Sequence, residues 1–444
     1  DVRVCRSAHY FRPSQPVVSM TDPQKDTAAA PHQGETYSDI VWRQFRKKKE
    51  ALYALYAMLP LFLIAVFAPM IASNQPFVFF GDGETIYPWF RSLFHSQEPV
   101  DYFYNMALLA FVPWIVVMLV TNFRMRRRGI PLQRRFSRFA AQYAALTIGF
   151  CLFFWLLDLA GFAPTNKYFT RTFVAEQFKS DGQEWGIYPP IKFGPSEQDT
   201  PSKYQPPGYR KTEDIRDIND AHTHWLGTDD SGRDILVRLI YGTRISMSVG
   251  FVAVGIYISI GVVVGAIAGF FGGVTDMLIS RIIEVVMLFP AFFLILTLVA
   301  LIGPSIWIIM FVIGITGWPG IARLIRGEVL KQRRLEYVEA ARALGVSRWR
   351  IIFLHILPNS LAPALVAAPF GVAGAIVTEA GLSLLGFGVQ PPTPSWGSVL
   401  SLGNANYQYS WLVLAPSVAM FLTLTTFNLV GSGLRDAMDP RLRI

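Results

Sequence analysis

Long apolar runs separated by short basic stretches dominate this chain of 444 residues. A helix that crosses the roughly 30 Å of bilayer hydrocarbon needs about 20 apolar residues, because it rises about 1.5 Å per residue. Eight runs reach or approach that length, and the sixth is the weakest of them. They lie at about residues 51–72, 105–122, 139–162, 244–271, 280–302, 305–320, 360–385 and 411–432. The pattern predicts an all-α polytopic membrane protein with about eight transmembrane helices.

The composition agrees with a membrane protein. Hydrophobic residues make up 52% of the chain and charged residues only 16%, whereas about a quarter of the residues in soluble domains are charged. The net charge of +9 would also suit a nucleic-acid-binding protein. However, the basic stretches adjoin apolar runs, so we expect no nucleic acid partner. The two cysteines, Cys5 and Cys151, imply no disulfide framework.

Lysine and arginine are concentrated in four stretches, at residues 43–49, 124–138, 323–350 and 435–443. Short cytoplasmic loops carry an excess of these residues, so we assign all four stretches to the cytoplasmic side. An even number of predicted spans then separates each stretch from the next. The predicted topology is therefore self-consistent and places both termini in the cytoplasm.

The same pattern divides the chain into segments. The first 19 residues precede Met20 and lack the apolar core of a signal peptide, so we expect an extension upstream of the natural start. Residues 163–243 are rich in proline, which removes hydrogen-bond donors, and should have little regular structure. The expected segments are a disordered cytoplasmic tail (1–50), an N-terminal transmembrane helix with an extra hairpin (51–162), an extracytoplasmic segment (163–243), a core of membrane helices (244–434) with a loop at 321–358, and a cytoplasmic tail (435–444).

A charged segment between the sixth and seventh runs carries a Glu-Ala-Ala motif at 339–341, followed by Gly345 and by Leu-Pro at 357–358. Residues 335–344 predict one amphipathic helix that ends at Gly345, because glycine readily adopts the left-handed conformation of a C-cap. Ser347 is a suitable N-cap for a second helix. The apolar side of the first helix would comprise Leu335, Val338, Ala341 and the pair at 343–344. The alternative is an ordinary amphipathic helix at the membrane interface.

The motif and its spacing resemble the EAA loop of bacterial ABC-importer permeases. Two further blocks, His224–Asp234 running into residues 239–246 and Thr378–Gly397, resemble the dipeptide/oligopeptide/nickel permeases. The resemblance covers about residues 215–440, roughly half the chain, and is closest to the C-type permease. His355 departs from the general EAA pattern but suits the peptide-type subgroup. The extra hairpin and residues 163–215 resemble the YejE-like oligopeptide subgroup.

The resemblance implies a type I ABC importer transmembrane domain, with a core of five helices, in the bacterial inner membrane. It implies a second permease, two ATPase subunits that carry ATP and Mg, an extracytoplasmic binding protein and a peptide substrate. The sequence contains no phosphate-binding G-x-x-x-x-G-K-[ST] motif, so we expect neither a cofactor on this chain nor an enzyme. The alternatives are a nickel or other small-solute importer and a secondary transporter. The implied coupling residues are Glu339, Ala340, Ala341, Arg342, Gly345, Arg348, Arg350, Leu357 and Pro358.

The block before the core is rich in turn-forming residues and carboxylates. We expect a structural loop held by Asp–Arg and Asp–backbone bonds. Its members are Gly227, Thr228, Asp229, Gly232, Arg233 and Asp234. A less favoured alternative is a metal site, whose ligands would be His222, His224, Asp229 and Asp230.

Three further expectations concern the membrane helices. Glu379 lies within an apolar run and either lines the translocation path or pairs with a neighbouring helix or the second permease. Glycines at 261, 265 and 269 should allow another helix to approach closely. Glu284 should form a salt bridge with Arg281 near the membrane interface.

Overall fold

The computed structural model describes residues 37–81, 84–94, 98–127, 132–160, 185–211 and 222–439. The expected upstream extension and most of the N-terminal tail lie outside the described residues. So do much of the proline-rich segment and the last five residues of the chain.

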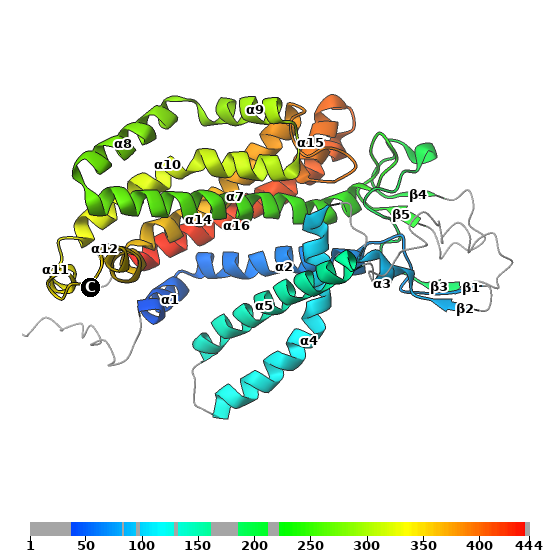
Figure 1. The fold of residues 1–444 in the computed structure, drawn as a ribbon. Helices are drawn as coiled ribbons and strands as arrows, with labels where there is room; N and C mark the ends of the chain where they lie inside the picture. The colour runs from blue at the N-terminus through cyan, green and yellow to red at the C-terminus, as the bar shows by residue number, and fades with distance from the viewer. Residues whose placement is uncertain are drawn as a thin grey trace, which may run out of the picture.

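Four long helices run side by side and form the centre of the structure (Figure 1). They are α7 (Ile235–Phe271), α10 (Ile306–Gln332), α14 (Ala362–Leu384) and α16 (Ser410–Met438). Within the described residues, seven helices are long and apolar enough to cross a membrane; the others are α2 (Lys49–Ile71), α4 (Pro99–Arg127) and the greater part of α5 (Leu132–Leu159). The prediction of an all-helical, multi-spanning architecture is confirmed.

The predicted fifth span is not one straight helix. It consists of α8 (Gly273–Leu288) and α9 (Ala291–Ile302), which are bent by 82° at a short break that contains Pro290. With 12 residues, α9 is about 18 Å long and cannot cross the hydrocarbon alone. The count of eight spans holds only if this bent pair is one span. The expected Arg281–Glu284 salt bridge is present on α8, at 2.6 Å and exposed to solvent or lipid.

Two other helices are longer than their apolar runs. The helix α7 begins at Ile235 rather than at residue 244, because Asp234 caps it: the Asp234 carboxylate accepts a hydrogen bond from the Val237 N–H at 2.9 Å. The helix α10 continues to Gln332 rather than ending near residue 320. The charged first part of the predicted loop is therefore a helical extension of a membrane span.

The close packing predicted for the glycine series is confirmed. A Cβ atom at Gly265 would lie 2.5 Å from the Ala322 carbonyl oxygen, and one at Gly269 would lie 2.8 Å from the Arg326 carbonyl oxygen. A Cβ at Gly261 would lie 2.7 Å from Ile321. One face of α7 therefore packs directly on the backbone of α10, as small residues permit in membrane helices.

Gly265→Ala is expected to lower the free energy of unfolding by about 1–3 kcal/mol, because the added methyl group must push α10 away. Gly255→Ala is the matched control in the same helix, since a Cβ there meets nothing within 4 Å. The control should be neutral or stabilising by up to about 1 kcal/mol. Thermal unfolding in detergent compares the two variants, and equal melting temperatures would contradict the packing argument.

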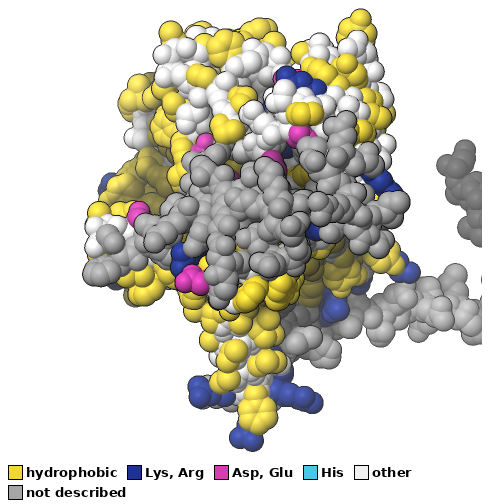
Figure 2. Space-filling model, turned by 90° about the vertical axis from the view of Figure 1, so that its right-hand side faces the viewer, with side chains coloured by type: hydrophobic (Ala, Val, Ile, Leu, Met, Phe, Trp, Pro, Cys, Tyr) yellow, Lys and Arg dark blue, Asp and Glu magenta, His cyan; other side chains and the backbone are white. Residues whose placement is uncertain are grey.

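The extra hairpin, formed by α4 and α5, extends away from the central bundle (Figure 1). Its two helices are joined by side-chain hydrogen bonds: Trp114 Nε1 donates to the Phe139 carbonyl at 2.9 Å, and the Tyr143 hydroxyl donates to the Ala107 carbonyl at 2.9 Å. Hydrophobic side chains cover the projecting hairpin, and basic side chains gather at its far end (Figure 2). This surface suits a hairpin that contacts lipid along its length.

Short strands and helices cover the end of the bundle opposite α11 (Glu336–Ala343) (Figure 1). The all-α prediction did not include these strands. One sheet has the order β2-β1-β3 and is antiparallel, with Phe79 opposite both Ile86 and Gly186. A second pairs β4 with β5. The elements are β1 (Val78–Gly81), β2 (Glu84–Ile86), α3 (Pro88–Ser92), β3 (Trp185–Ile187), η1 (Thr200–Ser202), β4 (Tyr209–Lys211) and β5 (His222–His224).

The two ends of the described chain meet beside the central bundle. The first helix, α1 (Tyr37–Lys47), packs Phe45 against Ala51 and Ala437. Lys48 forms an ion pair with Asp436 near the end of α16. The described N-terminal and C-terminal ends therefore lie on the same side of the helix bundle, near α11 (Figure 1).

Candidate functional site

The predicted Glu-Ala-Ala segment forms a helical elbow, which we define as residues 333–360. The helix α11 (Glu336–Ala343) ends at Gly345, whose φ is +74°. The Gly345 N–H donates to the Arg342 carbonyl at 3.0 Å, and the Val346 N–H donates to the Ala341 carbonyl at 3.1 Å. This pair of bonds is a Schellman motif, which satisfies the last carbonyls of a helix. The predicted helix and its glycine cap are confirmed.

The second half of the elbow leads into the next span almost without interruption. It comprises α12 (Arg348–Arg350), a π-helical segment η3 (Ile351–Ile356) and α13 (Leu357–Ser360), after which α14 begins. Ser347 occupies the N-cap position but makes no side-chain cap bond. Pro358 is the second residue of α13, which follows the π-helical segment directly. A nearly continuous helical path therefore joins the elbow to α14.

The elbow is anchored on its inner side only. Val338 and Ala341 are buried in a cluster with residues of α10 and η3, including Val329 and Ile352. Two apolar residues expected on the same side, Leu335 and Leu344, are instead 42% and 83% exposed. They lie outside the buried face because the helix is only eight residues long and Leu344 falls beyond its last turn. Glu339 and Ala340 are also exposed. The outer side of the elbow is thus exposed, while its inner side is packed against α10 and η3.

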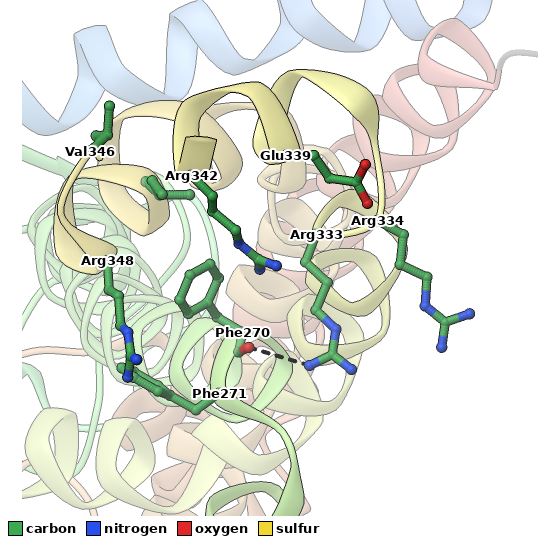
Figure 3. Close-up of a pocket in the computed structure, with 9 residues that line it drawn as sticks. Phe270, Phe271, Arg333, Arg334, Glu339, Arg342, Val346 and Arg348 are labelled. Carbon is green, nitrogen blue, oxygen red and sulfur yellow. Dashed lines mark hydrogen bonds between the residues drawn. The ribbon is translucent and has the colours of Figure 1, made fainter. Parts of the chain in front are cut away.

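Four arginines and Glu339 line a pocket of about 710 Å³ between the elbow and the end of α7 (Figure 3). Arg342 reaches from α11 towards α7, where its guanidinium lies 5.3 Å from the Phe270 ring centroid. Arg348 points to the same end of α7, whereas Arg350 does not line the pocket. Of the predicted coupling arginines, Arg342 and Arg348 therefore line the pocket beside α7, whereas Arg350 lies outside it.

The block before the core forms the predicted structural cap over the N-terminus of α7. The carboxylate of Asp229 is buried and accepts from Arg233 Nε at 2.7 Å, from the Arg233 N–H at 2.9 Å and from the Ser231 N–H at 2.9 Å. A second carboxylate, that of Asp234, is paired with His224 Nδ1 at 2.8 Å. These groups are engaged with one another and with the backbone.

Two glycines of this cap permit close approaches between loops. Gly232 has φ of +75°, and a Cβ there would lie 1.8 Å from the Asp199 carbonyl oxygen. Gly227 has φ of +78°, and a Cβ there would lie 2.5 Å from the Gln205 carbonyl oxygen. Thr228 completes the contact, since its hydroxyl donates to the Ser202 carbonyl.

The metal-site alternative finds no support in this geometry. Across the described parts of the chain, no group of three or more His, Cys, Asp or Glu side chains is arranged to hold a metal ion. The side chain of His222, one of the four ligands considered, lies outside what the structure describes.

The cap is also tied to the helices at the C-terminal end of the chain. Tyr204 stacks on Tyr409 with ring centroids 4.2 Å apart, and its hydroxyl donates to Asn406 at 3.1 Å. Loss of hydration raises the pKa of the Tyr204 phenol, and repulsion from the Asp230 carboxylate raises it further by a smaller amount. Tyr204 therefore stays neutral and keeps its hydrogen bond over the physiological pH range.

Glu379 is fully buried between α14 and the start of α15 (Trp396–Ala405). Its Oε1 accepts from the Ser383 and Ser395 hydroxyls, each at 2.8 Å. Its Oε2 has no hydrogen-bond partner among the described residues. In this conformation the carboxyl group contacts a neighbouring helix of the same chain, which is the arrangement expected if Glu379 holds α14 and α15 together.

Substitution of Glu379 separates its two predicted roles. Glu379→Gln retains an acceptor for both serines, so a holding role predicts nearly unchanged stability and uptake. Glu379→Leu removes that acceptor and should lower the free energy of unfolding by about 1–3 kcal/mol. Thermal unfolding and substrate uptake measure the two effects. Loss of uptake in the Gln variant without loss of stability would instead assign Glu379 to the translocation path.

Sequence reasoning overlooked Arg244, a buried arginine in the N-terminal part of α7. Arg244 is fully buried and donates to the Ala65 carbonyl at 2.6 Å, to Asn105 at 3.0 Å and to the Asp101 carboxylate at 3.1 Å. The Tyr241 ring lies 5.2 Å from its guanidinium. Three helices, α2, α4 and α7, therefore converge on one side chain. The signal was available, since an arginine within an otherwise apolar run needs partners.

Two protein families match parts of this sequence. Residues 261–444 match the family described as binding-protein-dependent transport system inner membrane component. Residues 36–90 match the N-terminal TM domain of oligopeptide transport permease C. A solved structure, the methionine ABC transporter MetNI in inward-facing conformations, covers 46% of this chain and 97% of its own at 17% identity and a TM-score of 0.38.

The chain matches three curated relatives over most of the length of each relative. The dipeptide transport system permease protein DppC of Alkalihalophilus pseudofirmus is 45% identical over 50% of this chain and 73% of that protein. The oligopeptide transport system permease protein OppC of Haemophilus influenzae is 47% identical over 50% of this chain and 71% of that protein. The peptidoglycan transport system permease protein YejE of Agrobacterium fabrum is 34% identical over 63% of this chain and 77% of that protein.

The helix bundle and these relatives define a polytopic transport permease. The chain belongs to the family of binding-protein-dependent transport system inner membrane components. The resemblance predicted from its motifs is confirmed, and the family places the chain in the bacterial inner membrane.

Proposed function

We propose that this chain is one of two permease subunits that together form the membrane pathway of a peptide importer. An extracytoplasmic peptide-binding protein would deliver the cargo, and two ATPase subunits carrying ATP and Mg would supply the energy. The printed functions of the relatives, which transport dipeptides, oligopeptides or peptidoglycan, support a peptide cargo. A small-solute cargo such as nickel is the second candidate.

The elbow is the observation that carries this proposal. Its outer surface is uncovered, while Val338 and Ala341 fix its inner side to α10 and η3. The helical path through η3 and Pro358 then continues into α14. A displacement of the elbow would therefore move two central helices together. Closure of the ATPases on ATP would shift the population from an inward-facing to an outward-facing state.

We assign the coupling residues to three tasks. Glu339, Ala340 and Arg350 are exposed and would contact the ATPase directly. Ala341 and Gly345 would set the shape of the elbow. Leu357 and Pro358 would transmit its movement to α14. Arg342 and Arg348 would support the inner side of the elbow, because they line the pocket beside α7.

Both termini would lie in the cytoplasm, on the side of the elbow. The basic stretches support this orientation through the positive-inside rule. The Lys48–Asp436 ion pair supports a common side for both ends, because it brings the first and last described helices together near α11 (Figure 1).

Purification of a C-terminally tagged full chain from its native membrane tests the proposal. We expect gentle detergent extraction to recover a second permease and P-loop ATPase subunits, identified by mass spectrometry. Peptide uptake by the reconstituted complex, with nickel uptake as the comparison, then tests the cargo. Recovery of the chain without any ATPase in several detergents, together with uptake that needs no ATP, would indicate a secondary transporter.

A further inference from the structure

The pocket between the elbow and α7 has a strong positive charge that the coupling role does not explain. It is lined by Arg333, Arg334, Arg342 and Arg348 and by one acid, Glu339, which gives it a formal net charge of +3. Arg333 uses one nitrogen to hold the carbonyls of Gly269 and Phe270, at 3.0 and 3.2 Å. Within the described residues, no carboxylate forms an ion pair with any of the other three arginines.

The α7 wall of the pocket ends an uncharged stretch of helix that is long enough to span a bilayer. No charged residue follows Arg244 in α7, and the stretch from Ile245 to Phe271 is about 40 Å long. A bilayer is about 40–45 Å thick including its headgroups. A stretch of this length is sufficient to place the last turn of α7, which forms one wall of the pocket, in a headgroup layer. The distribution of lysine and arginine makes this the cytoplasmic layer.

Apolar and aromatic side chains surround the same place. Trp349 is 55% exposed, and its ring lies 5.8 Å from that of Phe271 at the pocket wall. The apolar side chains of Val346 and Ile351 also line the pocket. Tryptophan beside basic side chains is typical of a membrane interface. Arg342 and Arg348 point towards α7 rather than away from the elbow, so they face this layer (Figure 3).

We propose that this pocket binds the phosphate group of an acidic phospholipid of the cytoplasmic leaflet. Its volume of about 710 Å³ accommodates a headgroup. Planar guanidinium groups bind phosphate oxygens through paired hydrogen bonds. Arg342 and Arg348, which both point towards α7 (Figure 3), would hold the phosphate. The bound lipid would then brace the inner side of the elbow.

Native mass spectrometry of the purified full chain, exchanged into detergent with phosphatidylglycerol or phosphatidylcholine, tests this site. We expect selective retention of phosphatidylglycerol. The double variant R342Q/R348Q should reduce that retention about 25-fold, since each arginine near a membrane surface contributes roughly a fivefold preference for anionic lipid. The matched control is R323Q/R350Q, which removes two exposed arginines of the same region that do not line the pocket.

R342K/R348K separates a binding defect from misfolding, because it keeps both charges and should retain part of the lipid. Three results would overturn the proposal. The first is equal lipid loss in the pocket variant and the control, and the second is displacement of all bound lipid by inorganic phosphate at equal concentration. The third is unchanged lipid retention in R342Q/R348Q; if ATPase recovery is lost in that variant, the pocket belongs to a protein partner. The lipid measurement needs no ATPase, so its failure leaves the proposed transport function untouched.

Discussion

Gly345→Asp is expected to reduce substrate uptake about tenfold or more while the chain still inserts and folds. A Cβ at Gly345 would meet nothing within 4 Å, so the substitution creates no clash. Its backbone has φ of +74°, however, which an L-residue adopts at a cost of about 1 kcal/mol. The new carboxylate would also lie at the negative end of α11. Both effects favour another shape of the elbow, and uptake in cells together with ATP hydrolysis by the complex measures the uncoupling.

Gly386→Asp is the matched control for this prediction. Gly386 also has a positive φ, +82°, and open space around its Cβ, but it follows α14 and is not part of the elbow. The backbone cost is therefore similar, while the coupling surface is intact. We expect the control to keep most of its uptake. Normal uptake in Gly345→Asp would refute the coupling role, and equal loss in both variants would attribute the defect to strain alone.

Arg244→Met is expected to lower the free energy of unfolding by about 3–5 kcal/mol, because it leaves buried partners of a charged network unpaired. The affected partners are Asp101, Asn105 and the Ala65 carbonyl. Loss of the network should also loosen the hairpin of α4 and α5 from the bundle, since Asp101 and Asn105 belong to α4. Thermal unfolding in detergent measures the first effect, and limited proteolysis of the hairpin measures the second.

Arg281→Met provides the comparison for Arg244. Arg281 also forms an ion pair with a carboxylate, but its side chain is 73% exposed. An exposed pair contributes at most about 1 kcal/mol. If the two variants melt at the same temperature, burial of the Arg244 network contributes little to the stability of the chain.

The elbow shows how far the sequence alone can define a site. The end of α11 at Gly345 and the exposed Glu339 were predictable, because a capping glycine and a short amphipathic helix depend on neighbours in sequence. The pocket beside it was not, because its walls come from the end of α7 and from the elbow, which are distant in the sequence. The exposed Leu344 was also misjudged, since only the packing of α11 on α10 decided which apolar residues are buried.

Proline positions show the same limit in the membrane helices. The predicted fifth span breaks next to Pro290, and the proline was visible in the sequence. Yet Pro60, Pro113, Pro319 and Pro416 lie inside helices that continue without interruption. A proline removes one backbone hydrogen bond and weakens a helix locally. Whether the helix then breaks depends on what packs around it.

Local signals in the chain were sufficient for the membrane class, the approximate positions of the spans, the helix cap at Gly345 and the turns of the structural cap. Apolar length and backbone preferences act over short distances along the chain. Packing instead sets the 82° bend between α8 and α9, the burial of Arg244 among three helices and the contact of Glu379 with Ser395. Each of these depends on which helices approach one another, because partners distant in the sequence set the energy of a buried charge or a broken helix.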